Sequence, residues 1–473
     1  MKLALVDWIV ILLPLVFAEI TRRASSAPLA RRWAVLGAGL VTALSVAIAI
    51  QGAGRGATAD QVALGIEGER WRALAPLFVS AIGTFSMAMT PARCARAATF
   101  ARTLLVLSTS LGLVLSRTPM AGALFVALGT LPVILELRST PETAPLSRSF
   151  SAYLVPSALA IFVAAALEES GLGRIAFAFY LLGFAIRTAT VPFHSWLPRF
   201  FDRAPVGMVV MFAMPQLGVY LHARAVSVGL DAGFQGLIAS LAAVTAVFAA
   251  AMGAAQNRPR RALGYLLMSQ TALVIMGIES SSRAGYVGAL GSWFVSGLAS
   301  SGLAMTLAAL EARRGRITLD RPSGNFERAP LLAASYLVFG LAGVGAPLTF
   351  GFVAGDLLFE GTSHAYPVLA AMGILATAIN AIHVARGFFG AFSGAPSGAK
   401  RDLTPRERVA VSFLVGALLV MGTWPAAILR YFDAEPPAPT SGVVDLELDA
   451  SDVTALLVVG RDVGGPLHDV VGE

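Results

Sequence analysis

The sequence predicts an all-α polytopic membrane protein with about fourteen transmembrane helices. Of its 473 residues 56% are hydrophobic and only 13% are charged, whereas soluble domains carry about a quarter charged residues. Apolar runs recur from one end of the chain to the other with no polar domain between them, and arginines gather in alternate loops. These observations favour a chain whose main solvent is lipid.

Each predicted span follows from the length of helix that the bilayer requires. A helix needs about 20 apolar residues to cross the hydrocarbon core. On that criterion the spans are 3–20, 34–51, 72–90, 103–116, 119–137, 151–167, 175–192, 206–223, 233–254, 262–279, 286–311, 330–360, 366–389 and 408–430. Together they predict a transmembrane domain over residues 1–430, followed by an acidic extramembrane extension over 431–473.

The loops predict the orientation of the spans. Cytoplasmic loops carry an excess of arginine and lysine, and here the basic residues gather in every second loop. Examples are Arg22, Arg23, Arg31 and Arg32; Arg93, Arg96 and Arg102; Arg258, Arg260 and Arg261; and Arg313, Arg314 and Arg316. Both termini are therefore predicted on the non-cytoplasmic side of the membrane.

Composition also excludes several classes of function. The net charge of +7 comes from basic residues in short loops, so we predict no nucleic-acid partner. The single cysteine, Cys94, excludes a thiolate-held iron–sulfur cluster, a Cys-rich zinc site and an internal disulfide framework. The first span follows Lys2 and contains Asp7 without a small-residue cleavage site, so we expect it to be retained rather than removed as a signal peptide.

The segment FAIRTATVPFHSWLPRFFDRAPVG, residues 184–207, places Arg187 inside an apolar span. Pro192 follows five residues later, and proline breaks a helix because it lacks a backbone donor. A charge beside a helix break is a common way to build an ion site in transporters. Alternatively, Arg187 reaches an interface, with His194 and Trp196 as interfacial residues.

This segment closely resembles the antiporter-like proton-channel subunits of respiratory complex I. A basic residue, then VPFHSWLP, then AP at the start of the next helix is the shared pattern, which Mrp-type cation/proton antiporters and membrane-bound hydrogenases also have. The resemblance continues in RRALGYLLMSQTALVIMGI, GVGAPLTFGFVAGDLLFEG and IHVARGFFGAF. It covers about residues 100–395.

The resemblance implies two inverted five-helix repeats, with broken helices in the seventh and twelfth spans at Pro192 and Pro347. It also implies a multi-pass protein of a prokaryotic inner membrane, with homologous membrane subunits and a peripheral enzyme as partners. No catalytic residue, cofactor or metal site is expected in this chain, so any redox chemistry belongs to the partners.

The departures from the family pattern concern the residues that carry protons. The family uses a mid-membrane row of lysines, histidines and a glutamate. The glutamate position of the fifth span corresponds here to Val126 or Ala127, and the lysine positions of the seventh and eighth spans correspond to Arg187 and Gln216. The histidine position of the following repeat corresponds to Ser296, and the ionisable position of the twelfth span to Gly355, which precedes Asp356. The only lysines are Lys2 and Lys400, and arginine is effectively never deprotonated. The lysine relay of the family therefore cannot run through this chain.

The remaining candidates for proton handling are carboxylates and a histidine, since buried groups of these types can carry protons. They are Glu136, Glu311, Asp356, Glu360 and His383. Glu136 could instead pair with Arg138 and Glu311 with Arg313, while Glu360 could lie at the outer surface. His383 occupies a position that the family usually fills with an aromatic residue, and Asp356 lies beside the predicted break in the twelfth span.

Three functions remain open at this point. The first is a membrane subunit of a complex I-like proton-translocating oxidoreductase with a degenerate or altered relay. The second is a subunit of a cation/proton antiporter or of an inorganic-carbon uptake system, which would need a continuous titratable path. The third is a non-conducting structural scaffold that anchors a peripheral enzyme.

Overall fold

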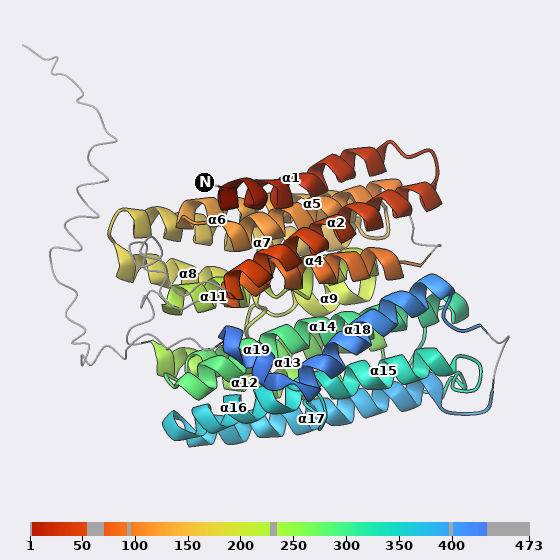
Figure 1. The fold of residues 1–473 in the computed structure, drawn as a ribbon. Coiled ribbons are helices and arrows are strands. Elements are labelled where there is room, and N and C mark those ends of the chain that lie inside the picture. Colours follow the sequence, from red (N-terminus) through yellow and green to blue (C-terminus); the bar gives the residue numbers. More distant parts are fainter. Residues whose placement is uncertain (1, 54–70, 92–95, 228–233, 397–400, 433–473) are drawn as a thin grey trace, which may run out of the picture. The chain divides into compact units, whose positions relative to one another are not determined.

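The computed structural model describes residues 2–53, 71–91, 96–227, 234–396 and 401–432, and every regular element within these ranges is an α-helix. Figure 1 shows the helices running alongside one another. The first group comprises α1 (Lys2–Arg22), α2 (Ala27–Ala53), α4 (Trp71–Met89), α5 (Ala97–Leu115), α6 (Pro119–Arg138), α7 (Ala144–Glu169) and α8 (Gly173–Arg187).

Short helices then lead to the second group. They are α9 (Trp196–Arg203), α10 (Val206–Ala213) and α11 (Leu217–Ser227). The second group comprises α12 (Gln235–Ala254), α13 (Pro259–Ile278), α14 (Arg283–Arg314), α15 (Pro330–Gly343), α16 (Phe350–Ala365), α17 (Pro367–Phe392), α18 (Pro405–Thr423) and α19 (Pro425–Phe432).

Local sequence explains where several helices begin. Thr118 precedes Pro119 and its side chain accepts a hydrogen bond from the amide of Ala121 at 3.2 Å. Thr404 forms a capping box with Glu407, and Pro405 opens α18. A hydroxyl at the N-cap satisfies an unpaired amide, and proline is tolerated at the first helical position because its missing donor would be unused there.

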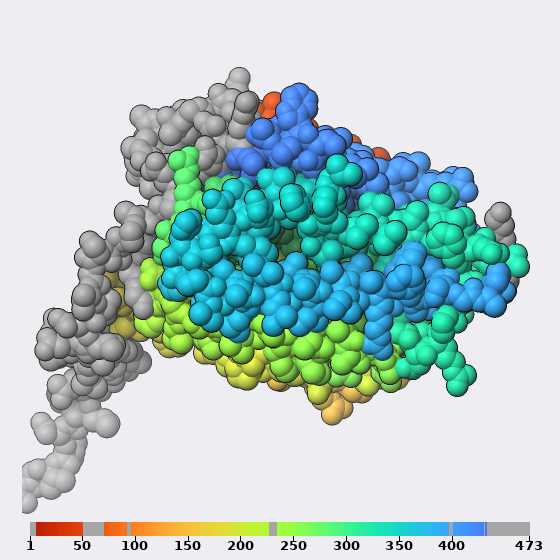
Figure 2. All heavy atoms as spheres, turned by 90° about the horizontal axis from the view of Figure 1, so that it is seen from below, coloured from red at the N-terminus to blue at the C-terminus, as the bar shows by residue number. Residues whose placement is uncertain are grey.

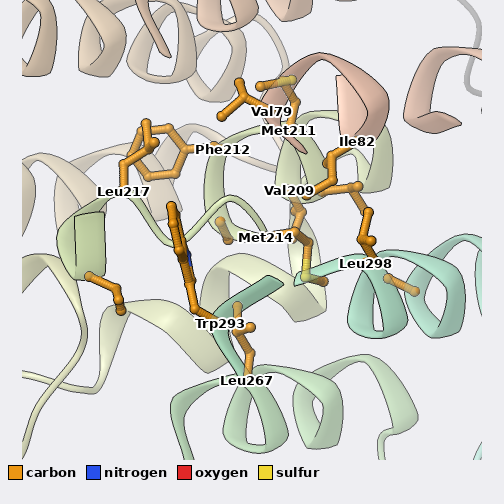
Figure 3. Close-up of a cluster of buried hydrophobic side chains, with 14 of the residues drawn as sticks. Val79, Ile82, Val209, Met211, Phe212, Met214, Leu217, Leu267, Trp293 and Leu298 are labelled. Atoms are coloured by element: carbon orange, nitrogen blue, oxygen red, sulfur yellow. The ribbon is translucent and has the colours of Figure 1, made fainter. Parts of the chain in front are cut away.

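The two groups meet through α10, which lies inside the molecule. Figure 3 shows Met211 and Phe212 of α10 among side chains of α4, α11, α13 and α14. Trp293 of α14 donates its indole N–H to the carbonyl oxygen of Pro215 at 3.0 Å. A buried indole needs such a partner, so this bond fixes the chain immediately after α10.

Helices at the periphery present apolar side chains outward, as lipid contact requires. Leu159, Val368 and Phe413 are 60%, 71% and 71% exposed. Figure 2 shows the face that α15, α16 and α17 form. Ten described helical segments are long and apolar enough to cross a membrane, and Pro330–Gly343 is a shorter apolar helix. The chain is therefore a multi-pass membrane protein, while the count of fourteen spans stays a prediction.

The helices follow the order of the predicted spans. The predicted eighth span lies in the membrane-crossing segment Val206–Val226, but its helix is interrupted in the middle. Residues 214–216 separate α10 from α11, because Pro215 supplies no amide donor and Gln216 has a φ of +47°. The predicted last span is also interrupted, at Trp424, after which Pro425 starts α19. Cys94 and residues 433–473 of the predicted extension lie outside the described residues.

Candidate proton pathway at three helix breaks

Three interruptions of helices bring polar side chains into the apolar bundle. The first spans residues 188–195 between α8 and α9 and contains Pro192. The second is the 214–216 segment, and the third spans 344–349 between α15 and α16 and contains Pro347. Non-helical backbone at membrane depth is tolerated where protein or a water-filled cavity surrounds it.

Arg187 is the last residue of α8 and points into the protein. Its guanidinium carbon lies 5.2 Å from the centroid of the Phe212 ring, within range of a cation–π interaction. Its Nη1 is buried without a hydrogen-bond partner, and no carboxylate of the described residues forms an ion pair with it. The arginine is thus a half-buried cation that lies against an aromatic face and whose Nη1 is enclosed by protein.

A small cavity of about 30 Å³ adjoins Arg187, with Gln216 and Thr271 also in its wall. This volume is close to that of one water molecule. His194 does not line this cavity. Its ring instead packs edge-to-face on Phe248 at 5.0 Å, so the structure does not bring Arg187 and His194 together.

Gln216, in the second break, satisfies its amide with two hydroxyl groups. Its Nε2 donates to Ser296 Oγ at 2.9 Å, and its Oε1 accepts from Thr271 Oγ1 at 3.1 Å. The sequence predicts that Gln216 and Ser296 correspond to a lysine and a histidine of the family pattern. The structure therefore joins them directly, as a neutral amide–hydroxyl pair.

Neighbours of Thr271 on α13 extend this neutral row. Gln270 accepts from Ser300 Oγ at 2.9 Å and donates to the carbonyl oxygen of Gly343 at 2.7 Å. Ser269 accepts from Asn380 Nδ2 at 2.9 Å. Three consecutive residues of α13 thus bind side chains or backbone of the second helix break, α14, α15 and α17 without a formal charge. We call residues 216, 269–271, 296, 300 and 380 the amide–hydroxyl row.

Asp356 lies in the second turn of α16 beside the third break. Its side chain is exposed on the isolated chain, and it lines a cavity of about 250 Å³ together with Gln270 and Ser296. The row and Asp356 therefore meet at one cavity. Glu360, one turn further along α16, is also exposed.

His383 lies elsewhere, buried on α17 against α12. A Cβ atom built at Gly253 would lie 2.9 Å from its Nδ1, so the glycine permits this close approach. That nitrogen is buried and has no hydrogen-bond partner among the described residues. His383 does not line the cavity that contains Asp356.

The carboxylates near helix ends have partners other than those expected from the sequence. Glu136 accepts from Arg102 and from Thr99 Oγ1, each at 2.6 Å, rather than pairing with Arg138. On a helix, residues two apart point in different directions, so the bond comes from the neighbouring helix α5. For the same reason Glu311 pairs with Arg260 of α13 at 2.5 Å. Arg313, its expected partner, binds Glu407 of α18.

Sequence analysis missed one buried pair of ionisable residues. His222 of α11 and Glu279, which follows α13, lie with Nε2 and Oε1 2.5 Å apart, and their side chains are 2% and 0% exposed. The signal was present, because His222 falls inside the predicted eighth span and Glu279 ends the tenth. Within the described residues, no group of three or more His, Cys, Asp or Glu side chains could hold a metal ion.

A family model described as NADH:quinone oxidoreductase/Mrp antiporter, transmembrane, matches residues 112–380. The chain belongs to this family. It is 31% identical over 256 residues to NADH-quinone oxidoreductase subunit 13 of Thermus thermophilus, covering 53% of this chain and 55% of that protein. It is 28% identical over 258 residues to subunit M of the corresponding Mycobacterium tuberculosis enzyme. The matched region spans about half the length of these relatives.

Solved structures show the same fold. A chain of respiratory complex I from Thermus thermophilus superposes with a TM-score of 0.79 at 24% identity, covering 90% of this chain and 97% of that one. A chain of the Mrp complex from Dietzia superposes with a TM-score of 0.81 at 18% identity, covering 92% and 97%. These family members are subunits of multisubunit membrane complexes.

Proposed function

We propose that the chain is a membrane subunit of a complex I-like proton-translocating oxidoreductase assembly, and that its proton relay is altered. The family membership and the relatives from NADH-quinone oxidoreductases support the assembly. The proposal includes fourteen spans in two inverted repeats, both termini on the non-cytoplasmic side, and partners comprising homologous membrane subunits and a peripheral enzyme.

The observation that carries the altered relay is the amide–hydroxyl row. Side-chain amides and hydroxyls hydrogen-bond but neither gain nor lose a proton near neutral pH. Gln216 binds both Thr271 and Ser296, so the residues predicted at the lysine and histidine positions, Gln216 and Ser296, are joined in a neutral network. Protons crossing here must use water along the row and the few ionisable groups at its ends, Arg187 by its charge and Asp356 by titration.

Proton flux in liposomes that hold the purified assembly tests this function. We compare the wild type with Asp356→Asn, which removes a group that can transfer protons, and Arg187→Ala, which removes the fixed charge beside the first break. We expect each change to reduce substrate-driven acidification at least about tenfold. Matched controls are Asp320→Asn, an exposed loop aspartate, and Arg174→Ala, an exposed arginine at the other end of α8. The controls should leave the flux unchanged.

The same experiment separates the non-conducting scaffold from the altered channel. If both site variants pump like the wild type while the assembly remains intact on gel filtration, the chain does not conduct protons and its role is structural. The arginines at the ends of α13 and α14 would then be the natural surface for a peripheral partner. If the assembly falls apart in a variant, Arg187→Lys, which retains the charge, distinguishes loss of packing from loss of conduction.

A further inference from the structure

The pair formed by His222 and Glu279 is the only histidine–carboxylate contact within 4 Å among the described residues. Both side chains are almost completely buried, and the two atoms that face each other are 2.5 Å apart. Two groups that both bind protons, at this distance, must share a proton or bear opposite charges, because two unprotonated acceptors would repel each other. The contact therefore holds at least one proton in some state of the protein.

A cavity adjoins the His222 side of this pair. The cavity measures about 330 Å³ and lies between α8, α11, α12 and α13, with His222 in its wall beside Thr188 and Thr190. Leu182 and Leu241, which also line it, are 42% and 43% exposed on the chain. The cavity is large enough for several water molecules, and His222, Thr188 and Thr190 are the polar side chains in its otherwise apolar wall.

The same cavity approaches the first helix break. Thr188 lines both this cavity and the small cavity beside Arg187 and Gln216. Thr188 Oγ1 lies 3.0 Å from Thr190 Oγ1, so hydroxyls mark the path between the two spaces. Gly218 lets α11 approach this point, since a Cβ atom there would lie 2.6 Å from Thr188 Cγ2.

We infer that His222 and Glu279 form a proton-binding site. In this chain the site takes the proton-carrying role of the lysines that are absent from its spans. The pair takes up one proton through the cavity. A neutral imidazole beside a carboxylate, with net charge −1, thereby becomes an imidazolium–carboxylate pair with net charge zero, and release of the proton restores the first state. This inference rests on the proposed function for its role in transport.

Charged and titratable groups surround the pair on several sides. Arg224 is on the same helix, and Tyr180 of α8 donates a hydrogen bond to Glu168 of α7 at 2.7 Å across the cavity that Arg224 lines. Tyr366, after α16, interacts electrostatically with Glu279. The N-terminal turn of α14 follows Glu279 directly and carries Arg283 and Tyr286, both of which have interaction partners. On α8, the residue facing the imidazole is Phe184, with ring centroids 5.8 Å apart.

Infrared difference spectroscopy of the purified, full-length chain in lipid nanodiscs tests the site directly. Spectra recorded between about pH 5 and pH 9, the range in which histidine sites change charge, should contain coupled carboxyl and imidazole bands. We expect Glu279→Gln and His222→Gln each to remove both bands, because the two groups titrate as one unit. His364→Gln and Glu142→Gln, which alter exposed side chains, are the controls and should retain them.

The double variant His222→Gln with Glu279→Gln keeps the test valid if a single variant fails to fold, since two amides can hydrogen-bond to each other. Absence of the coupled bands in the folded wild type overturns the inference, as does their survival in the folded double variant.

In assembly liposomes the double variant should reduce flux at least about tenfold. If the wild type pumps protons and the double variant shows the same flux, the role of the pair in transport is overturned. A wild type that shows the bands but does not pump refutes the proposed function and leaves the proton site standing.

Discussion

The centre of the bundle and the ends of its helices handle polar groups in opposite ways. At the ends, carboxylates pair with arginines of other helices, as Glu136 does with Arg102 and Glu311 with Arg260. At the centre, Gln216 and its neighbours form a network without formal charge. A buried charge needs a partner or costs several kcal/mol, whereas an amide needs only its hydrogen bonds. The chain therefore concentrates its fixed charges at the helix ends and leaves few ionisable groups at the centre.

Glu311→Ala is the strongest test of the helix-end pairs. Removing the carboxylate leaves the guanidinium of Arg260, whose side chain is 18% exposed, without its partner. We expect a loss of about 3–5 kcal/mol in the free energy of unfolding, the cost of breaking a buried pair. A denaturant series in detergent measures it.

The double variant Arg260→Met with Glu311→Leu is the control for that change. It removes both charges and keeps apolar volume, which is often neutral or stabilising. A Glu311→Ala protein as stable as the wild type would contradict the view that this pair holds α13 and α14 together.

Gln216→Leu tests the neutral row at the centre. The leucine has a similar size, but it leaves the hydroxyl of Thr271 without its acceptor and removes the bond to Ser296. We expect a loss of about 1–3 kcal/mol, the cost of an unsatisfied buried polar group. Gln256→Leu should cost less, because the side chain of Gln256, just after α12, bonds only to the carbonyl oxygen of Met252 in the last turn of that helix. Equal effects of the two changes, measured by thermal unfolding, would refute the special role of the row.

Gly218→Ala tests the close approach of α11 to the first break. The added methyl group would lie 2.6 Å from Thr188 Cγ2, and overpacking of this kind costs about 1–3 kcal/mol. Gly416→Ala is the matched control because nothing lies within 4 Å of its Cβ position. It should be neutral or slightly stabilising, since alanine favours a helix more than glycine does. A stable Gly218→Ala protein would show that Thr188 can move aside.

The smallest effect is expected at an ion pair whose arginine is exposed and whose buried carboxylate has a second arginine as partner. Arg258 donates to Asp202 Oδ2 at 2.9 Å, but its side chain is 61% exposed, and Arg316 also contacts Asp202. Arg258→Ala should change the free energy of unfolding by less than about 1 kcal/mol, as for other exposed pairs. A larger loss in the same denaturant series would mean that this pair is not screened by solvent.

Features set by nearby residues could be predicted from the sequence. Composition predicted a helical membrane protein, and the motif around Arg187 predicted its family, which the family model confirms. Pro192 and Pro347 lie in two interruptions because a missing donor acts within one turn. Pro215 carries the same local signal, yet the long apolar run around it favoured one continuous span.

Features set by distant residues could not be predicted in this way. Gln216 binds side chains 55 and 80 residues away, and His222 meets Glu279 across 57 residues. The expected partner of Glu136 was the nearest arginine in sequence, whereas its actual partner is 34 residues away. Partners of this kind depend on which helices become neighbours, and spacing along one helix does not contain that information.

The position of the Arg187 guanidinium over the Phe212 ring has a consequence for the leakage of cations. The aromatic face stabilises the cation without neutralising it, and arginine keeps its charge at every physiological pH. A second cation about 4 Å away would meet a repulsion of roughly 4 kcal/mol at an effective dielectric constant of 20. The first helix break therefore raises the energy of a second cation, such as a sodium ion, that comes within a few ångströms of Arg187.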